Sequence, residues 1–268
     1  MENLSGITVV LPTLNEEENI KSLIPGIVNV MDKNNIINYE ILVVDDNSQD
    51  NTNELIRLMN ISNPKINIYQ REGLRSLPMS IWDGIDNSRY EYVMWLDADG
   101  SMTPNAVEKL IVKLNEDNEK IIVGSRFVEF GGYKGVKDIG KDSIFDAIKN
   151  VSKSNDSVFG MIFSIFFNKF LKYIFVGNVS DITSGFIVGN KKNFNKESFE
   201  KADYGEYFIY LCVDILKNKK EIIEVGYVCE TRVHGTSKTA SNLIQLIKRG
   251  VPYIQAALNS RKENNENS

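Results

Sequence analysis

The sequence predicts an α/β fold in which a mostly parallel sheet is flanked by helices. Short apolar runs bounded by turn residues alternate with segments whose apolar residues recur at helical spacing. This alternation is typical of parallel sheets, because two parallel strands need a crossover connection. No G-x-G-x-x-G and no G-x-x-x-x-G-K-[ST] follows a strand, which argues against a Rossmann dehydrogenase and a P-loop nucleotidase.

The expected elements follow in order along the chain. Continuous Val-, Ile- and Leu-rich runs predict buried strands at Ile7–Leu11, Tyr39–Val44, Ile66–Tyr69, Tyr92–Leu96, Ile121–Gly124, Ser184–Val188 and Ile222–Thr231. Amphipathic spacing predicts helices at Glu16–Met31, Asn51–Asn60, Met79–Asn87, Ser157–Val176, Tyr204–Lys217 and Ala240–Leu258. The third of these helices follows Pro78, which suits a first helical turn. The polar stretches Lys134–Asp156 and Arg261–Ser268 are expected to be a mobile loop and a disordered tail.

Composition excludes several classes of protein. The 268 residues carry a formal net charge of −5, so a broad nucleic-acid-binding surface is not expected. Cys212, Cys229 and the single His234 cannot form a disulfide framework or a Cys/His metal site, and two core cysteines are typical of a cytosolic protein. The amino terminus has no basic region followed by a cleavage site, so no signal peptide is expected.

The most apolar segment, Ser157–Val176, has two interpretations. Phenylalanine and other apolar residues cover most of its circumference and leave a narrow polar stripe that includes Asn168 and Lys172. About 20 residues reach across a bilayer, but Lys169 and Lys172 interrupt the segment, so we expect no transmembrane span. An amphipathic helix lying in the membrane interface and an ordinary core helix both remain open.

Two aspartates that follow the strand Tyr92–Leu96 are the most informative residues. Asp97 and Asp99 flank Ala98 at the carboxyl end of a buried strand, where open α/β sheets bind ligands. Carboxylate oxygens suit a hard divalent cation, which neutralises a leaving diphosphate. The alternative is a pair of turn or helix-capping aspartates, because Asp is common at strand ends.

Two further loops and three cations are expected near the same edge. Leu11–Glu16 ends the first strand and Val43–Ser48 the second, where carboxylates accept hydrogen bonds from a nucleobase or ribose. For each of these loops the alternative is a helix cap. Arg126 follows the fifth strand, and Arg232 and Lys238 share a later loop. Cations beside an acidic site indicate a second anionic group besides the diphosphate, and a solvated basic loop is the alternative for the last two.

Six motifs follow one another along the chain: Pro12-Thr13-Leu14-Asn15-Glu16, Val44-Asp45-Asp46-Asn47-Ser48, Asp97-Ala98-Asp99, Gly124-Ser125-Arg126, Ser180-Asp181-Ile182-Thr183-Ser184-Gly185-Phe186 and Arg232…Gly235…Ser237-Lys238. This ordered set resembles family-2 glycosyltransferases of the GT-A fold, which is Rossmann-like. Within them the chain is most similar to dolichyl-phosphate mannosyltransferases and related polyprenyl-phosphate glycosyltransferases. The resemblance implies a GDP- or UDP-hexose donor, Mg²⁺ or Mn²⁺, a polyprenyl phosphate acceptor and inversion at the anomeric carbon.

The resemblance also implies a role for each site residue. Donor contacts are expected from Pro12, Leu14, Glu16, Val44, Asp46, Asp97, Ala98 and Asp99. The metal is expected at Asp97, Asp99 and Ser101, and the sugar pocket at Asp181 and Ser184. The acceptor phosphate is expected at Arg126, Arg232 and Lys238, and the residues implied to act in catalysis are Asp99, Arg126 and Arg232.

The sequence departs from this family at several points, including Leu74–Pro78, which replaces the family's glycine-rich segment before the fourth strand. Ser101 stands where the family often has a metal-neighbouring Gln, and Lys134–Asp156 has no clear match for the arginine and serine of the family's acceptor loop. We expect a catalytic domain over residues 1–238, in which 134–178 form an acceptor loop and interface helix, followed by an amphipathic helix and tail over 239–268. Membrane contact is expected to rest on the two amphipathic segments, on the cytoplasmic face.

Two rival functions are kept open. A family-2 enzyme that glycosylates a sugar or protein hydroxyl needs a general base, for which Glu206 is the candidate. A lipid- or nucleotide-binding relative without catalytic activity is the other rival. An assay of metal-dependent sugar transfer from nucleotide sugars to a polyprenyl phosphate distinguishes the three functions from one another.

Overall fold

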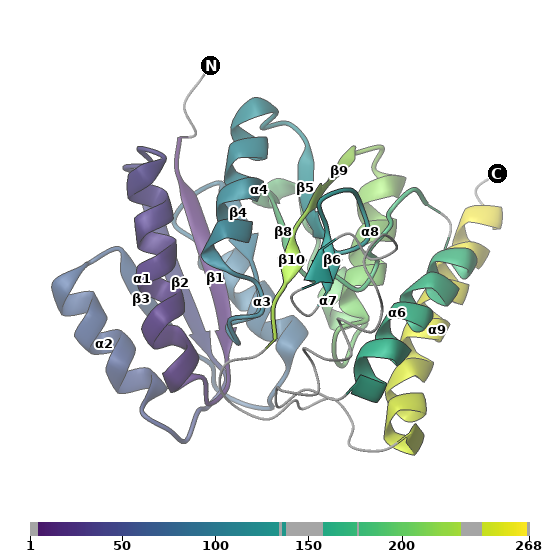
Figure 1. Cartoon of the computed structure of the whole chain (residues 1–268), viewed down its shortest axis with the longest axis horizontal. Helices are drawn as coiled ribbons and strands as arrows, with labels where there is room; N and C mark the ends of the chain where they lie inside the picture. The colour runs from purple at the N-terminus through teal and green to yellow at the C-terminus, as the bar shows by residue number, and fades with distance from the viewer. Residues whose placement is uncertain (1–4, 134–135, 138–157, 176, 232–242, 267–268) are drawn as a thin grey trace.

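A seven-stranded sheet runs through the middle of the protein, as a computed structural model shows (Figure 1). The structure describes residues 5–133, 136–137, 158–175, 177–231 and 243–266. The sheet order is β3-β2-β1-β4-β8-β5-β9, with bounds β3 Ile66–Gln70, β2 Tyr39–Asp45, β1 Ile7–Thr13, β4 Tyr92–Trp95, β8 Ile187–Asn190, β5 Ile121–Ser125 and β9 Ile222–Gly226. Only β8 runs antiparallel to its neighbours in this sheet. The expected mostly parallel sheet is therefore confirmed.

Helices cover both faces of this sheet (Figure 1). One face carries α1 (Glu17–Lys33), α2 (Thr52–Ser62) and α4 (Pro104–Glu116), and the other carries α3 (Leu77–Asp86), α7 (Glu197–Glu200) and α8 (Tyr207–Lys217). Successive strand residues point to opposite faces. In β1, for example, Val9 and Leu11 pack in the core under α1, whereas Val10 packs in the core under α3.

The structure differs from the expected elements at several points. Helix α4 was not expected, although Thr103 accepts a hydrogen bond from the Ala106 N–H and Pro104 opens the helix, a usual amino-terminal signal. The expected strand Ser184–Val188 is displaced, because Gly185 has a φ of +66° and β8 begins only at Ile187.

The expected strand Ile222–Thr231 is two strands in two sheets. After β9 the chain enters β10 (Val228–Cys229), which belongs to a small sheet with β6 (Gly132–Tyr133) and β7 (Val136–Lys137). At the bend, a Cβ added to Gly226 would lie 2.1 Å from the carbonyl oxygen of Glu129. Only glycine lets the backbones approach this closely.

Two helices pair at one edge of the molecule, beside α8 (Figure 1). They are α6 (Val158–Ile174) and α9 (Leu243–Glu266), and α9 continues as helix through most of the tail that was expected to be disordered. The α6 residue Leu171 is buried, as is Phe175 just beyond the helix, whereas Phe166, Phe170 and Tyr173 are exposed. Within the described residues, no helix combines the length and the apolar character needed to cross a bilayer.

Candidate functional site

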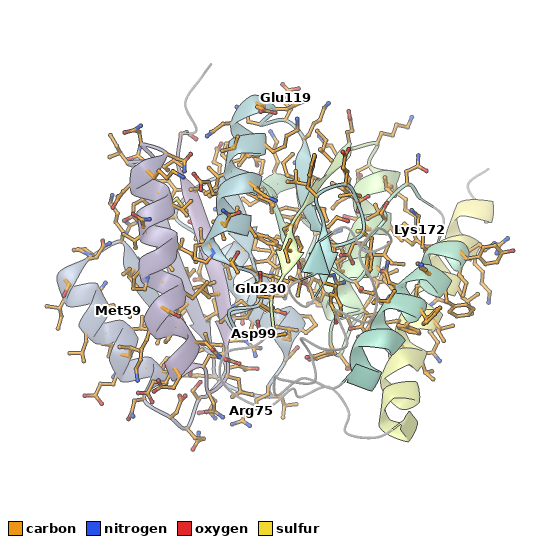
Figure 2. The ribbon with its side chains drawn as sticks, in the orientation of Figure 1. Met59, Arg75, Asp99, Glu119, Lys172 and Glu230 are labelled. Carbon is orange, nitrogen blue, oxygen red and sulfur yellow. The ribbon has the colours of Figure 1, made fainter. Side chains whose placement is uncertain are left out.

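A pocket of about 260 Å³ lies at the carboxyl ends of β1, β2 and β4. The strand order reverses at β1, which pairs with β2 on one side and β4 on the other, and such a switch point is where open α/β sheets bind ligands. Figure 2 shows Asp99 and Arg75 in the lower half of the molecule and Glu119 at the opposite edge. The lining residues are Pro12, Thr13, Leu14, Glu16, Asp46, Arg75, Ser76, Leu77, Ser80, Asp97, Ala98, Asp99, Asp203 and Tyr204.

The structure brings together all the residues expected to contact the donor except Val44. The side chain of Val44 is fully buried, in the core under α3, and does not line the pocket. The donor contact expected from Val44 therefore stays a prediction. Val44 lies within β2, whereas Asp46 follows the end of that strand. Asp46, two positions later, does line the pocket.

The carboxylates of Asp97 and Asp99 occupy different environments in the pocket. Asp97 is exposed, whereas Asp99 is only 5% exposed and its Oδ1 accepts the N–H of Ser101 at 2.9 Å. Gly100, with a φ of +78°, makes this tight turn possible. Ser101 is buried and does not line the pocket. Its backbone N–H orients Asp99, and its expected role at the metal stays a prediction.

The aspartate pair fits a hard divalent cation. Both side chains belong to one pocket and offer the oxygen donors that Mg²⁺ and Mn²⁺ prefer. Among the residues described, no three His, Cys, Asp or Glu side chains cluster as a complete metal site. A cation held here would therefore keep open positions for phosphate oxygens or water.

The wall formed by residues 75–77 was missed by the sequence reasoning. Asp46 holds it in place, because its Oδ1 accepts from Arg71 at 2.6 Å and its Oδ2 accepts the N–H of Ser76 at 2.7 Å. Arg71 also donates to Asp83 at 2.7 Å. Burial alone would lower the pKa of the Arg71 guanidinium, but Asp83 and Asp46 raise it above its usual value. Arg75 projects from this wall and lines the pocket.

The loops after β1 and β2 brace each other. Asn15, with a φ of +58°, donates its N–H to the Ser48 hydroxyl at 2.8 Å, and its Oδ1 accepts the N–H of Gln49 at 2.7 Å. The hydroxyl and N–H of Ser48 are in turn bound by Asp45. Asn15 and Ser48 therefore hold the two loops together, where a helix cap had been the alternative expectation.

Arg126 and Asp181 form a buried ion pair. The guanidinium Nε and Nη2 of Arg126 donate to the two carboxylate oxygens of Asp181, each at 2.7 Å, and Nη2 also donates to Thr183 at 2.8 Å. Burial alone would lower the pKa of this guanidinium, and the Asp181 carboxylate more than offsets that effect and raises the pKa well above its usual value. Neither Arg126 nor Asp181 lines the pocket.

Both residues expected at the sugar pocket are engaged by protein groups, and their expected role stays a prediction. Asp181 is fully buried and holds Arg126, and Ser184, also buried, donates its hydroxyl to the carbonyl of Gly124. Both residues therefore stabilise the end of β5. Arg126 is engaged by Asp181 and does not line the pocket, and its expected role at a phosphate stays a prediction.

Helix α6 is tied to the same ion pair by its polar stripe. The Asn168 amide donates to the Ser180 carbonyl at 2.9 Å, and its oxygen accepts from the Thr183 hydroxyl at 3.3 Å. Lys172 donates to the Ser180 hydroxyl at 3.1 Å. From the other side, Glu224 accepts the N–H groups of Ser180 and Asp181 at 2.7 and 3.0 Å. The polar stripe noted in the sequence thus fixes the segment that carries Asp181.

A second missed wall is formed by Asp203 and Tyr204, just before α8. Glu206 is 3% exposed and does not line the pocket. Its Oε1 accepts the N–H of Asp203 at 2.8 Å and that of Tyr204 at 3.2 Å. The candidate base therefore lies behind the wall, where it shapes the turn. Arg232, His234 and Lys238 lie outside the described residues.

Comparison with known proteins supplies the family context. Residues 8–197 match the family model described as glycosyl transferase family 2. A dolichol-phosphate mannosyltransferase from Pyrococcus furiosus is 31% identical over 47% of this chain, and the match spans only 34% of that relative's length. An Escherichia coli β-1,3-glucosyltransferase, WfgD, which acts on UDP-Glc and α-D-GlcNAc-diphosphoundecaprenol, is 21% identical over 91% of this chain and 83% of its own length.

Solved structures show the same fold. The glucosyl-3-phosphoglycerate synthase of Mycobacterium tuberculosis, in complex with Mn²⁺, UDP-glucose and phosphoglyceric acid, superposes with a TM-score of 0.61 at 18% identity. The match covers 95% of this chain and 79% of that one. The chain therefore has the GT-A fold that its motifs predict.

Proposed function

Because the chain belongs to glycosyl transferase family 2, we propose that it transfers a hexose from a nucleotide diphosphate sugar to a polyprenyl phosphate with inversion. The observation that carries the proposal is the pocket at the switch point, which collects Pro12, Leu14 and Asp46 from two loops beside the Asp97–Asp99 turn. A nucleoside and a diphosphate each find suitable groups there. The GDP- or UDP-hexose donor is supported by the names of the relatives, which include a dolichol-phosphate mannosyltransferase and a UDP-Glc-dependent enzyme.

The protein residues at the diphosphate are proposed to act mainly by positioning. A Mg²⁺ or Mn²⁺ ion bound by Asp97 and Asp99 would supply charge neutralisation for the leaving nucleotide. Asp99 is oriented by the Ser101 N–H, which donates to one of its carboxylate oxygens. Arg232 and Lys238, which lie outside the described residues, are proposed to bind the acceptor phosphate.

A polyprenyl phosphate is favoured over a hydroxyl acceptor by the place of Glu206. A phosphate monoester has a second pKa of about 6 and is already ionised near neutral pH, so it needs charge compensation and orientation more than a base. A hydroxyl acceptor needs a base. Glu206 accepts two backbone N–H groups behind the pocket wall, which favours a structural role.

A membrane surface is proposed as the source of this acceptor. On α6, Phe166, Phe170 and Tyr173 are exposed, the last by 85%, next to the exposed Lys169 and Lys172. Aromatic residues flanked by lysines suit the interface of an anionic bilayer. We therefore propose peripheral attachment at the cytoplasmic face, in a catalytic domain over residues 1–238 and an attached helix over 239–268.

Transfer from radiolabelled UDP- and GDP-hexoses to a polyprenyl phosphate tests the reaction. We expect a chloroform-soluble labelled product that requires a divalent cation and falls by at least about 100-fold in Asp99→Asn. Asp86→Asn, at the exposed end of α3, is the matched control and should retain activity. Donor hydrolysis without a lipid product would redirect the proposal to a hydroxyl acceptor, and no reaction with any donor by folded protein would favour a binding protein.

Flotation with anionic liposomes tests the membrane surface separately. The full chain should float, and Phe166→Ser with Tyr173→Ser should weaken flotation. Ile37→Ser with Ile61→Ser removes two comparably exposed apolar side chains elsewhere and should leave it unchanged. Equal behaviour of both double variants would remove α6 from the proposal.

A further inference from the structure

We propose that Asp203 and Tyr204 form the sugar-binding wall of the pocket, and that the transferred sugar is a neutral hexose recognised through its hydroxyl groups. Glu206 is proposed as the positioning residue of this wall. The inference rests on the proposed function, because it assumes that a nucleotide sugar occupies the pocket. It replaces the expected assignment of the sugar site to Asp181 and Ser184, which are buried away from the pocket.

The order of the strands puts this wall at the sugar end. Moving across the sheet, the pocket passes from the loops after β2 and β1 to the Asp97–Asp99 turn after β4. The start of α8 continues in the same direction, because Tyr207 accepts a hydrogen bond from the Trp95 indole at 3.0 Å and its hydroxyl lies 3.2 Å from a Cβ added to Gly185, before β8. A diphosphate at the aspartates separates the nucleoside on the β1–β2 side from the sugar at Asp203 and Tyr204.

The wall is fixed in place from behind. Glu206 binds the N–H groups of both wall residues through one carboxylate oxygen. Next to them, Gly205 packs so closely on α9 that an added Cβ would lie 2.1 Å from the Tyr253 hydroxyl. Such support preorganises a binding group and lowers the cost of ordering it when a ligand binds.

The chemistry of the wall suits a neutral sugar. Asp203 is exposed and offers carboxylate oxygens, which accept hydrogen bonds from sugar hydroxyls. Tyr204 is 48% exposed, so its ring offers an apolar face and its hydroxyl a polar tip. Among the described lining residues Arg75 is the one cation, and it projects from the wall on the nucleoside side. The carboxylate of a uronic acid donor would therefore lie near the Asp203 carboxylate, and this wall offers no cation to offset the repulsion. Like charges at close range are unfavourable.

Steady-state kinetics with donor analogues test the wall in the full-length protein. The donors are the best UDP- or GDP-hexose, its monodeoxy analogues and the matching uronic acid. Asp203→Ala should lower kcat/KM for the hexose by about 10- to 100-fold, the usual range for a hydrogen bond to a charged group. One deoxy analogue should react almost equally with wild type and Asp203→Ala, because it lacks the partner hydroxyl. Asp203→Asn should raise the relative use of the uronic acid donor.

Glu206 variants separate positioning from base catalysis. Glu206→Gln keeps an oxygen that accepts both N–H groups and should retain most activity with an unchanged pH profile, whereas Glu206→Ala should raise KM for the donor. A base would lose turnover equally in both variants. Asp86→Ala, outside the pocket, is the control for a general effect of removing a carboxylate.

Calorimetry makes the inference testable even without turnover. In wild type the nucleotide sugar should bind more tightly than the nucleoside diphosphate alone, and this difference in affinity is the increment supplied by the hexose. Asp203→Ala should remove most of the increment, while the affinity for the nucleoside diphosphate changes less than about twofold. An unchanged increment, or unchanged discrimination among deoxy donors, would overturn the sugar wall and leave the transferase proposal intact. Absence of transfer in wild type would overturn the proposed reaction. The affinity increment would still test whether Asp203 and Tyr204 bind the sugar.

Discussion

Removal of Asp181 is the sharpest perturbation of the structural support beneath the site. Asp181→Ala would leave the guanidinium of Arg126, a residue that is 9% exposed, without the carboxylate that accepts two hydrogen bonds of 2.7 Å from it. Breaking a buried pair in this way costs about 3–5 kcal/mol, because a charge stays buried and uncompensated. Total stabilities are about 5–15 kcal/mol, so the loss is a large share of the whole.

Urea unfolding followed by circular dichroism measures this loss. At about 2–4 °C per kcal/mol for a chain of this size, thermal unfolding should also shift down by roughly 6–20 °C. The double variant Arg126→Met with Asp181→Leu should recover most of the stability, because removing both partners leaves no buried charge. Asp181→Asn should lie between wild type and Asp181→Ala, since one acceptor oxygen remains.

Two results would refute the reasoning. A loss below about 1 kcal/mol in Asp181→Ala would mean that water reaches the guanidinium and that the pair behaves as an exposed one. A double variant as unstable as the single variant would mean that packing around the side chains matters more than charge.

Three further predictions concern other parts of the protein. Cys212 is fully buried and burial raises the pKa of its thiol, so it should react with thiol reagents only on unfolding, and labelling at the native rate of a free thiol would contradict this. At Asp50, burial tends to raise the carboxyl pKa, but the Thr52 hydroxyl and backbone N–H groups lower it overall. The contribution of Asp50 to stability is therefore present above about pH 4 and lost as pH falls through the lowered pKa. The urea midpoint of unfolding should fall less at acid pH in Asp50→Asn than in wild type, and an equal fall in both proteins would contradict the prediction. Asn168→Leu strands the Ser180 carbonyl and should cost about 1–3 kcal/mol in urea unfolding, whereas a neutral result would show that water replaces the amide.

Sequence patterns predicted the fold from local information. The apolar runs of β1, β2 and β4 fix both the strands and the sheet edge that carries their following residues, because parallel strands end together. The periodicity of the chain was therefore enough to place the loop Leu11–Glu16 and the Asp97–Asp99 turn at one edge of the sheet, whereas the family resemblance indicated the individual residues. Helix α4 had equally local signals, since Thr103 and Pro104 mark its start, and it was predictable in the same way.

The direction and the neighbours of a side chain depend on distant residues. Asp181 resembles a ligand residue in sequence, yet it lies 55 positions from the Arg126 that it binds. Glu206 has a carboxylate of the kind that acts as a general base, yet this carboxylate accepts the N–H of Asp203 in the turn before α8. Their positions follow from which strands become neighbours and from how tightly the backbones pack between them.

The sequence by itself determined most of the element order, the sheet edge that carries the pocket and the paired carboxylates, because these follow from periodicity and from strand ends. Only the tertiary structure decided which charged groups are exposed to a ligand and which neutralise one another in the interior. A buried charge needs a partner, and that partner comes from whichever segment folding brings alongside. At Asp203 and Tyr204 the same process made a wall of the pocket from the turn before α8, where the sequence had indicated the start of a helix at Tyr204.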